Sequence, residues 1–500
     1  MSTSGDRHLG PDPAGLLPSA AAGDGHVTVV AEPAFAATFA GQALLRMLVD
    51  LLARQFSVLE RVELDVPRLP AISRATGAVA GEDLETALLR VGSAAGGSEI
   101  SVTRAGSTAE HVIFVGPGSP SRAGALSTIS AVANSWLATI SDDPVAAQVD
   151  LDELPFGPHL AAAIASDRLF RGLHGVGVTG TSHIELLAAP ELAIIRERLS
   201  GFRLPPCYVI GLGAVGAAFL LTLGATGIPA TVVGLDPDDS DTTSRNRLLS
   251  MGYEQVGIPK PQLAAVLVKG TELDFYPNEV AWPAYYGDPD RRRPKYLAAQ
   301  EAKYRYEWVI SAVDKNLHRR NIANILPLHV LSGATNGFVA QAAYMAMVGD
   351  CECLACNHPV PSFDLDATRD GLASVGAEER VAQLRAMGAS DADVVAIETY
   401  LDDPACGAIG EATLRRLGVD GGVDWAVGFV SAASGALLAA QFVRAAILGA
   451  ESGTSVGAER RLIFWGTPEL IDSLARRRTS CPVCGDVERQ QAFATRWDGL

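Results

Sequence analysis

The sequence predicts an α/β protein whose main domain is a Rossmann-like, mostly parallel sheet, and three features indicate this fold. Residues 208–210 are a short apolar run typical of a buried strand. A glycine-rich turn, residues 211–216, follows and leads into a mostly apolar helix. A second apolar run, residues 231–235, ends at Asp236. This order of strand, glycine loop, helix, strand and acid is typical of a nucleotide-binding βαβ unit.

The glycine loop has the features of a phosphate-binding turn. Gly211, Gly213 and Gly216 allow the backbone to turn tightly and to come close to a ligand. The helix that begins there offers free N–H groups and the positive end of its dipole to phosphate. Asp236 lies at the tip of the next strand, where its carboxylate can accept both hydroxyls of a ribose. We therefore expect these residues to bind a nucleotide.

Charged residues after Asp236 favour a triphosphate over a dinucleotide. Arg247 and Lys260 are cations placed after the acid, where they could reach the outer phosphates that NAD lacks. Another buried strand, residues 308–312, leads to Asp314. An Asp at the carboxyl end of a strand in this fold faces the ligand crevice, where it could hold magnesium. The sequence therefore predicts a site for ATP and Mg²⁺.

These motifs resemble the adenylation domain of the ubiquitin-activating superfamily, the ThiF/HesA/MoeB group of adenylyltransferases, over residues 205–490. The resemblance implies that Asp236 binds the ribose of ATP. It implies that Arg247 and Lys260 bind the phosphates and stabilise the charge that develops on them. It also implies that Asp314 binds Mg²⁺, which neutralises phosphate charge and orients the attack.

The chain departs from the family pattern at two positions. Ser244 stands where the family usually has Asn, and Lys315 stands where it often has a second Asn. Asn246 is a candidate for the missing amide, so we include it among the nucleotide-binding residues. The family also uses an Arg from the partner half of a dimer, which the sequence alone does not place.

The resemblance implies ATP-dependent activation of a carboxyl group. The C-terminal carboxylate of a small ubiquitin-like or sulfur-carrier protein ending in Gly would attack the α-phosphate, and pyrophosphate would leave. The adenylate would then pass to a cysteine of this chain, or directly to a sulfur donor or an amine. A downstream conjugating protein or a sulfur donor is therefore a further expected partner.

Two Cys-x-x-Cys knuckles predict a zinc site. Four thiolates at such spacings form a closed tetrahedral site, which is structural because no coordination position stays open. A redox dithiol and plain buried thiols are the alternatives. In the family, zinc at such a site pins the C-terminal segment to the domain. The expected ligands are Cys353, Cys356, Cys481 and Cys484.

Cys406 lies between the knuckles, in residues 360–424, which resemble the crossover region of the family. Many members place there the cysteine that takes the activated carboxyl group as a thioester. A thiol after a Pro and next to a Gly is a suitable nucleophile if its pKa is low. Asp402 and Asp403 oppose thiolate formation, so a structural cysteine is the alternative.

The chain divides by composition and pattern into four parts. We expect a disordered tail over 1–26, an N-terminal α/β domain over 27–150, a helical bridge over 151–204 and the adenylation domain over 205–500. The N-terminal unit includes a strand over 111–116 and a helix over 129–140.

The N-terminal unit has two interpretations. It lacks the acid, Arg and Lys order of the second unit, and its turn Gly116-Pro117-Gly118 places Pro where a phosphate loop needs an N–H. It is either a degenerate, non-catalytic copy that serves as an intrachain pseudo-dimer partner, or an unrelated α/β recognition domain. A homodimer of two chains stays open beside the pseudo-dimer.

Composition limits the partners. The net charge of −17 argues against nucleic acid and acidic membrane surfaces. Residues 425–448 are long and apolar enough for a membrane span, but Gly, Ala and Ser are abundant there and Gln441 and Arg444 interrupt the run. We expect a buried helix. Seven cysteines in 500 residues do not indicate a disulfide framework, and the first 25 residues do not look like a signal, so we expect a cytoplasmic protein.

Two other function classes stay open. A nicotinamide-dependent oxidoreductase would use the glycine loop and Asp236, but it would leave Arg247, Lys260, Asp314 and the cysteine knuckles without a role. A catalytically silent nucleotide-binding scaffold would keep the fold without turnover. Both the Ser at position 244 and the Lys at position 315 favour this second alternative.

Overall fold

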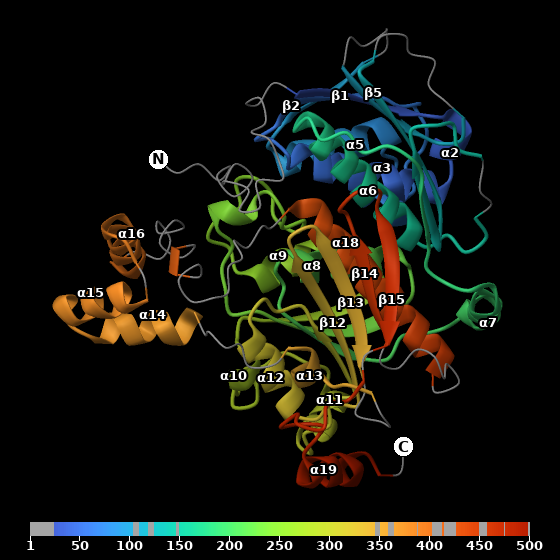
Figure 1. Cartoon of the computed structure of the whole chain (residues 1–500). Coiled ribbons are helices and arrows are strands. Elements are labelled where there is room, and N and C mark those ends of the chain that lie inside the picture. The colour runs from blue at the N-terminus through green and yellow to red at the C-terminus, as the bar shows by residue number, and fades with distance from the viewer. Residues whose placement is uncertain are drawn as a thin grey trace.

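The computed structural model describes residues 25–103, 110–118, 125–146, 150–345, 351–358, 365–387, 389–402, 413–414, 427–449, 458–474 and 476–498. These residues form two α/β domains, each built on one large sheet (Figure 1). The N-terminal domain lies at the top of the view and the C-terminal domain lies below it. The predicted tail falls almost wholly outside the described residues.

The N-terminal sheet has seven strands in the order β3-β2-β1-β4-β5-β6-β7. The first five positions in this order are parallel, and β6 and β7 run antiparallel. The strands are β1 (Gly25–Ala31), β2 (Leu59–Asp65), β3 (Glu99–Val102), β4 (His111–Val115), β5 (Ser127–Asn134), β6 (Leu137–Ser141) and β7 (Ser182–Glu185). The helices are α2 (Pro33–Ala36), α3 (Phe39–Ala53), α4 (Ser73–Thr76), α5 (Leu84–Ala95) and α6 (Phe156–Leu173), and α7 (Ala189–Leu199) leads to the second domain.

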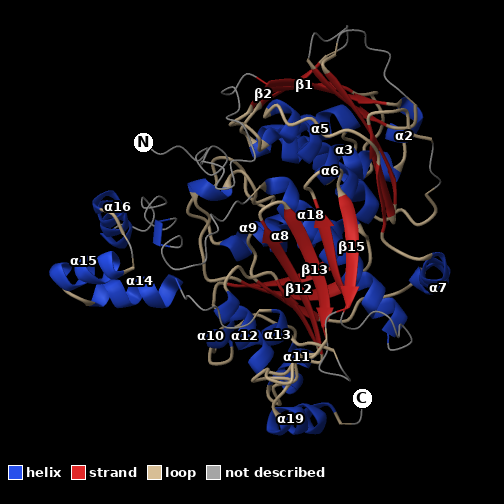
Figure 2. Cartoon of the chain, viewed as in Figure 1, coloured by secondary structure: helices blue, strands red, loops and turns tan. Residues whose placement is uncertain are grey.

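The C-terminal sheet has eight strands in the order β10-β9-β8-β11-β12-β13-β14-β15. The strands are β8 (Cys207–Ile210), β9 (Ala230–Leu235), β10 (Leu273–Asn278), β11 (Trp308–Ser311), β12 (His329–Asn336), β13 (Val339–Met345), β14 (Ala458–Ile463) and β15 (Glu469–Leu474). Its helices include α8 (Ala214–Ala225), α9 (Lys260–Leu267), α10 (Trp282–Tyr285), α11 (Lys295–Glu301), α12 (Asn316–Asn324), α13 (Leu354–Asn357), α18 (Gly428–Leu448) and α19 (Val487–Trp497). Figure 2 shows helices on both faces of this sheet.

The two domains repeat one topology. In each, the first strand lies between the second and the fourth, five strands are parallel, and the next two are antiparallel. In each, a long, almost wholly buried helix (α6 or α18) precedes the seventh strand and packs on the first long helix after the first strand (α3 or α8). The two domains therefore share one path of the chain through sheet and helices.

Two segments of the N-terminal domain differ from the predictions. Residues 129–140 form the β5–β6 hairpin and not a helix, because β5 also pairs with β4 and β6 with β7, and the Asn134 side chain accepts from the Trp136 N–H (3.0 Å) to close the turn. The domain also continues beyond residue 150: within 151–204, α6 packs on α3 and β5, and β7 pairs with β6.

The interface between the domains is helical and buried. Helix α18 packs on α8, α6, β12 and β13. Among the described residues, α18 has the length and hydropathy of a membrane span, but 94% of its apolar window is buried inside the molecule. The prediction of a buried helix in this region is therefore confirmed. His159 of α6, which is fully buried, shares a hydrogen bond between Nδ1 and Thr222 Oγ1 of α8 (2.9 Å) across the interface.

His159 makes the stability of the interface dependent on pH. Burial, assisted by Arg46, lowers its pKa from 6.5 to about 3. Between these values the unfolded chain binds a proton that the folded chain does not, so stability falls as the pH falls below 6.5. At pH 5 the cost is about 2 kcal/mol. Burial raises the pKa of Asp167 to about 7, which acts in the opposite direction over pH 4–7.

Between pH 7 and pH 5, we expect His159 to lower the free energy of unfolding of wild type by about 2 kcal/mol. The His159→Gln variant should not show this part of the decrease. Urea unfolding at both pH values measures this difference, and Asp167 contributes equally to both proteins. The exposed His183, changed to Gln, is the matched control and should leave the pH dependence as it is. Equal pH dependence in wild type and His159→Gln would contradict a neutral, buried His159.

Candidate nucleotide site and cysteine cluster

The predicted site residues follow three adjacent strands at the same edge of the C-terminal sheet. Strand β8 pairs with β9 so that Ile210 lies beside Leu235, and with β11 so that Ile210 lies beside Ser311. The glycine loop therefore begins between the residues that follow β9 and β11. The order of the strands reverses between β8 and β11, and ligands of such sheets bind at this switch point.

Close packing requires glycine at two of the three loop positions, and the third position is open. Gly211 has φ +90°, and a Cβ there would lie 2.7 Å from the Ala312 carbonyl oxygen, so the turn fits tightly against β11. A Cβ at Gly216 would lie 2.1 Å from the Gly211 oxygen, which keeps α8 close to the loop. A Cβ at Gly213 would meet no atom within 4 Å. Gly213 also caps α8 without a side-chain acceptor, so this end of α8 is open to an anion.

Asp236 organises the loop. Its carboxylate accepts from the N–H of Leu212 (2.7 Å) and from that of Asp238 (2.9 Å). Burial raises the pKa of Asp236, although Lys260 acts against this, with its Nζ 3.7 Å from Asp236 Oδ1. Lys260 also binds Asp238 (2.8 Å), whose side chain is largely exposed. The Lys260 side chain is itself only 15% exposed, so it joins one buried and one exposed carboxylate.

Burial acts to lower the pKa of Lys260, but Asp236 and Asp238 outweigh this effect and the pKa lies above its usual value. Lys260 is therefore a cation at neutral pH, and it begins α9 beside Asp236. A buried carboxylate and a cation thus lie side by side at this edge of the sheet.

The run 244–247 contains two buried side-chain donors without a hydrogen-bond partner, Nε of Arg245 and Nδ2 of Asn246. Asn246 is 1% exposed, its Oδ1 accepts from Arg247 Nη1 (3.0 Å), and its Nδ2 has no hydrogen-bond partner. Leaving a buried donor unpaired costs about 1–3 kcal/mol, so a ligand acceptor at this amide would be favourable. Ser244 has a different role, because its N–H (2.8 Å) and its hydroxyl (2.9 Å) both bind the Asp241 carboxylate.

Asp314 is exposed at the same edge, three residues after β11. Arg319 of α12 is buried and holds this turn, because its Nη1 donates to the Asp314 carbonyl (3.2 Å) and to Asn316 Oδ1 (3.0 Å). Burial lowers the pKa of Arg319 to about 10, and Asp314 acts against this shift. The exposed Asp314 carboxylate therefore lies on a turn whose backbone is held by the buried Arg319.

The corresponding edge of the N-terminal domain is closed to phosphate. Glu32 follows β1, as Gly211 follows β8, and its carboxylate accepts from the N–H groups of Ala34 (3.1 Å) and Phe35 (2.6 Å). An acid therefore caps the helix end that a phosphate would need. A Cβ at Gly116 would lie 2.5 Å from Glu32 Cβ, so the turn after β4 is also filled.

The four knuckle cysteines lie together, as predicted. All four are buried, and their Sγ atoms lie within 4.8 Å of one another. The Cys353–Cys481 distance is 3.7 Å and the Cys356–Cys484 distance is 3.2 Å. A tetrahedral Zn–S site with bonds of about 2.3 Å has sulfur atoms about 3.8 Å apart, so the set is compatible with zinc. The cluster joins the start of α13 to the segment that leads into α19.

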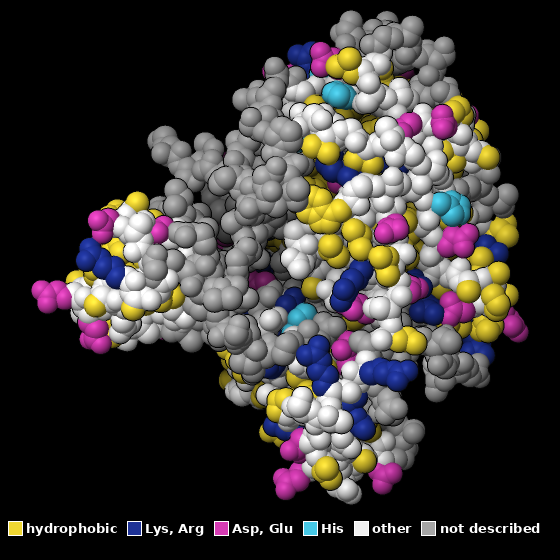
Figure 3. Space-filling model, viewed as in Figure 1, with side chains coloured by type: hydrophobic (Ala, Val, Ile, Leu, Met, Phe, Trp, Pro, Cys, Tyr) yellow, Lys and Arg dark blue, Asp and Glu magenta, His cyan; other side chains and the backbone are white. Residues whose placement is uncertain are grey.

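Cys406 lies outside the described residues, so its thioester role stays a prediction. Before it, α14 (Leu365–Ser374), α15 (Ala377–Ala386) and α16 (Asp391–Asp402) form a small helical unit. Figure 3 shows this unit standing apart from the body of the molecule. It has its own apolar cluster, made by Leu372, Leu384, Ile397, Tyr400 and Leu414.

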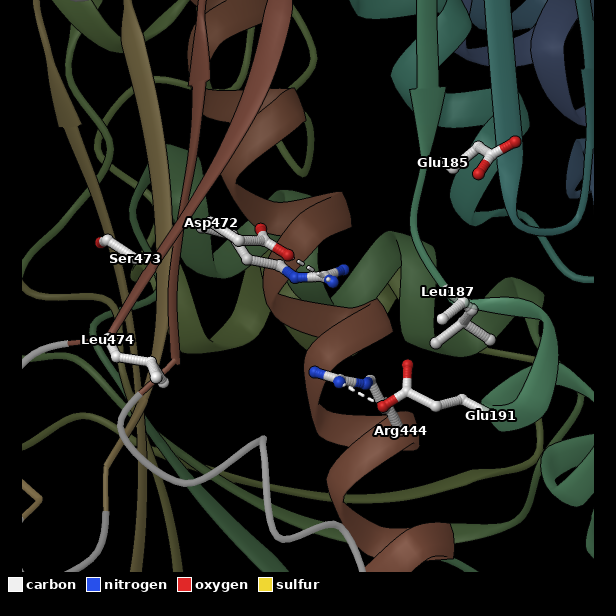
Figure 4. Close-up of a pocket in the computed structure, with 9 residues that line it drawn as sticks. Glu185, Leu187, Glu191, Arg444, Asp472, Ser473 and Leu474 are labelled. Atoms are coloured by element: carbon white, nitrogen blue, oxygen red, sulfur yellow. Dashed lines mark hydrogen bonds and ion pairs between the residues drawn. The ribbon is translucent and has the colours of Figure 1, made fainter.

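A separate hollow of about 450 Å³ lies at the seam between the domains, away from the glycine loop (Figure 4). Arg444 of α18 pairs with Glu191 of α7 (2.5 Å). Arg460 of β14 pairs with Asp472 (3.0 Å) and donates to the Leu186 carbonyl (2.6 Å). Both guanidinium groups thus bind carboxylates, and these contacts join the edge of the N-terminal domain to α18 and β14.

Comparison with known proteins gives distant similarities. No known protein family matches the sequence. The chain is 22% identical over 366 residues to the uncharacterized protein y4jF of Sinorhizobium fredii (strain NBRC 101917 / NGR234), covering 71% of this chain and 64% of that protein. The chain therefore spans less than two thirds of the length of this curated relative.

Among solved structures, the chain is similar to MccB of E. coli. The structure of MccB with MccA-N7isoASN has a TM-score of 0.37 and 13% identity, over 59% of this chain and 70% of that chain. The structure with ATP has a TM-score of 0.36 and 12% identity, over 59% and 69%. At this distance, the function has to be inferred from the residues of this chain itself.

Proposed function

We propose that this chain activates a carboxyl group by adenylation with ATP. The observation that carries the proposal is the meeting of an open glycine loop, a buried ribose-type acid with an adjacent cation, and an exposed Asp at the switch point of the sheet. The unpaired Nδ2 of Asn246 adds a donor that an ATP oxygen would satisfy.

The residues have separate roles in the proposed reaction. Gly213 and the open end of α8 hold phosphate, and Asp236 holds the ribose. Arg247 and Lys260 stabilise charge on the phosphates as the α-phosphorus is attacked. A carboxylate oxygen forms a bond to the α-phosphorus, the bond to the β-phosphate oxygen breaks, and pyrophosphate leaves.

Asp314 would hold Mg²⁺, which supplies charge neutralisation and orientation at the phosphates. Its carboxylate is exposed at the site edge, and Arg319 fixes the turn that carries it. The cysteine cluster would hold structural zinc, and the four buried thiols fit a closed tetrahedral site.

We further propose that the carboxylate belongs to the C-terminus of a small ubiquitin-like or sulfur-carrier protein. The Cys406 thiolate would then attack the acyl carbon of the adenylate, so that a thioester forms, the bond from the acyl carbon to the phosphate oxygen breaks, and AMP leaves. The N-terminal domain would serve as the silent half of an intrachain pseudo-dimer. The repeated topology supports this, and so does Glu32, which occupies the position where phosphate would bind.

A trapping experiment tests the transfer step. An oxyester is more stable than a thioester, so Cys406→Ser purified from the native host should carry a discrete added mass that mild base removes. Intact mass spectrometry beside wild type measures it and gives the size of the partner. An unmodified variant would count against Cys406 as carrier. A separate assay of pyrophosphate release tests adenylation. Release that does not depend on the partner, or no release with any carboxylate offered, would count against adenylation.

A further inference from the structure

The segment 245–253 carries two of the proposed phosphate-site residues but has no helix or strand of its own. On one side, Leu248 and Met251 pack with Ala217 of α8 and Leu263 of α9. On the other side, the segment meets the N-terminal domain. The position of Asn246 and Arg247 therefore depends on contacts from both domains.

Arg54 makes the central contact from the N-terminal domain. It lies at the end of α3, is 3% exposed, and reaches across the interface with both terminal nitrogens. Its Nη1 donates to the Arg245 carbonyl (2.8 Å) and its Nη2 donates to the Met251 carbonyl (2.9 Å). Its Nε binds Asp50 (2.7 Å), which fixes the guanidinium in this direction. One planar group thus spans the two ends of the loop that contains Asn246 and Arg247.

A second contact holds the far end of the segment. The N–H of Tyr253 donates to the Ala94 carbonyl at the end of α5 (2.9 Å), and its ring meets Phe56 edge to face (6.0 Å). A Cβ at Gly96, which has φ +69°, would lie 2.4 Å from Tyr253 Cβ. The N-terminal domain is therefore shaped to receive this end of the segment.

We infer that Arg54 is a positioning residue for the proposed nucleotide site, and that the silent N-terminal domain uses it to hold Asn246 and Arg247 in place from across the interface. The inference rests on the proposed function for its nucleotide readout, and on the contacts alone for its structural readout. Arg54 acts through the backbone of the segment and is not assigned a contact with the nucleotide.

The contacts of Arg54 matter for segment 245–253 for a physical reason. An irregular segment has few internal hydrogen bonds, so ordering it costs conformational entropy for each residue that is fixed. Two charge-assisted hydrogen bonds from a buried, preoriented guanidinium offset part of this cost before a nucleotide arrives. Without them, nucleotide binding has to order the loop itself, and affinity falls.

The test compares Arg54→Met with Arg46→Met. Arg46 lies on the same helix, is buried, and pairs with the same Asp50 (3.2 Å), so it is the matched control. We expect the amides of 245–253 to exchange hydrogen about tenfold faster in Arg54→Met than in Arg46→Met, and the Kd for Mg·ATP to rise about tenfold. Arg54→Lys, which keeps the charge beside Asp50, should recover part of both effects, and it serves alone if Arg54→Met does not fold.

Different results separate this inference from the proposed function. Equal exchange in 245–253 for the Arg54 and Arg46 variants, or an Arg54 effect spread evenly over the whole chain, would overturn the positioning role. If wild type does not bind Mg·ATP but exchange is faster in Arg54→Met, the proposed function would be overturned. The structural role of Arg54 in holding residues 245–253 would be kept. Faster exchange in Arg54→Met with an unchanged Kd for Mg·ATP would overturn the claim that Arg54 positions residues for nucleotide binding.

Discussion

Asp314→Ala is expected to weaken Mg·ATP binding about 100-fold while leaving the affinity for metal-free ATP nearly unchanged. The Asp314 carboxylate is the exposed acid at the carboxyl end of β11, and a Mg²⁺ ion bound there contributes several kcal/mol to phosphate binding. A loss of 1.4 kcal/mol is a tenfold change in affinity, so two such steps are expected. Calorimetric titration of ATP with and without Mg²⁺ measures the effect.

The control for Asp314 is Asp290→Ala, which removes an exposed carboxylate from the loop between α10 and α11. It should bind Mg·ATP as wild type does. If Asp314→Ala binds Mg·ATP with wild-type affinity, the metal lies elsewhere. If the affinity of Asp314→Ala for metal-free ATP falls as much as its affinity for Mg·ATP, Asp314 has a structural role and not a metal-binding one.

Cys481→Ala is expected to lose about one zinc per chain and to lower the Tm by more than 10 °C. Zinc binding to four thiolates contributes about 10 kcal/mol or more to folding at neutral pH, and three thiolates hold it less well. The loss should be local at first, because the cluster fastens α13 to the segment before α19. Metal analysis and differential scanning calorimetry of wild type and variant measure both quantities.

Cys207 supplies the matched control for the zinc prediction. It is fully buried at the start of β8 and lies outside the cluster, so Cys207→Ala should keep its zinc. Purified wild type that contains no zinc, and that gains none on incubation with it, would show that the four thiols are a buried packing cluster. A redox dithiol would instead show a reversible two-electron change that involves one Cys-x-x-Cys pair.

The features that the sequence predicted well are those with local signatures. The tight φ at Gly211 and the close approach at Gly216 need glycine, so the loop could be predicted directly. Asp236 follows a run of buried residues, and it does lie beside the loop. The cysteine pairs lie 128 residues apart, yet their matched spacings were enough to predict that they meet.

The features that the sequence did not predict depend on distant contacts. Arg54 reaches residues 191 and 197 positions away, and nothing near it in the sequence marks this contact. The apolar residues of 129–140 also fit a helical face, so the sequence predicts a helix there. Only the turn at Asn134 and the pairing with β4 and β7 decide for the β5–β6 hairpin. Arg291 and Arg293 both pair with the buried Glu301, and a run of like charges in the sequence does not indicate such a contact.

The measurement that tests the central claim most directly is binding of Mg·ATP and of NAD⁺ to the full chain, with hydrogen exchange of each complex. We predict that Mg·ATP binds and slows exchange in residues 211–216, 244–247 and 312–319, and that NAD⁺ does neither. Binding of NAD⁺ with protection of the glycine loop, and no binding of Mg·ATP, would contradict adenylation and favour an oxidoreductase.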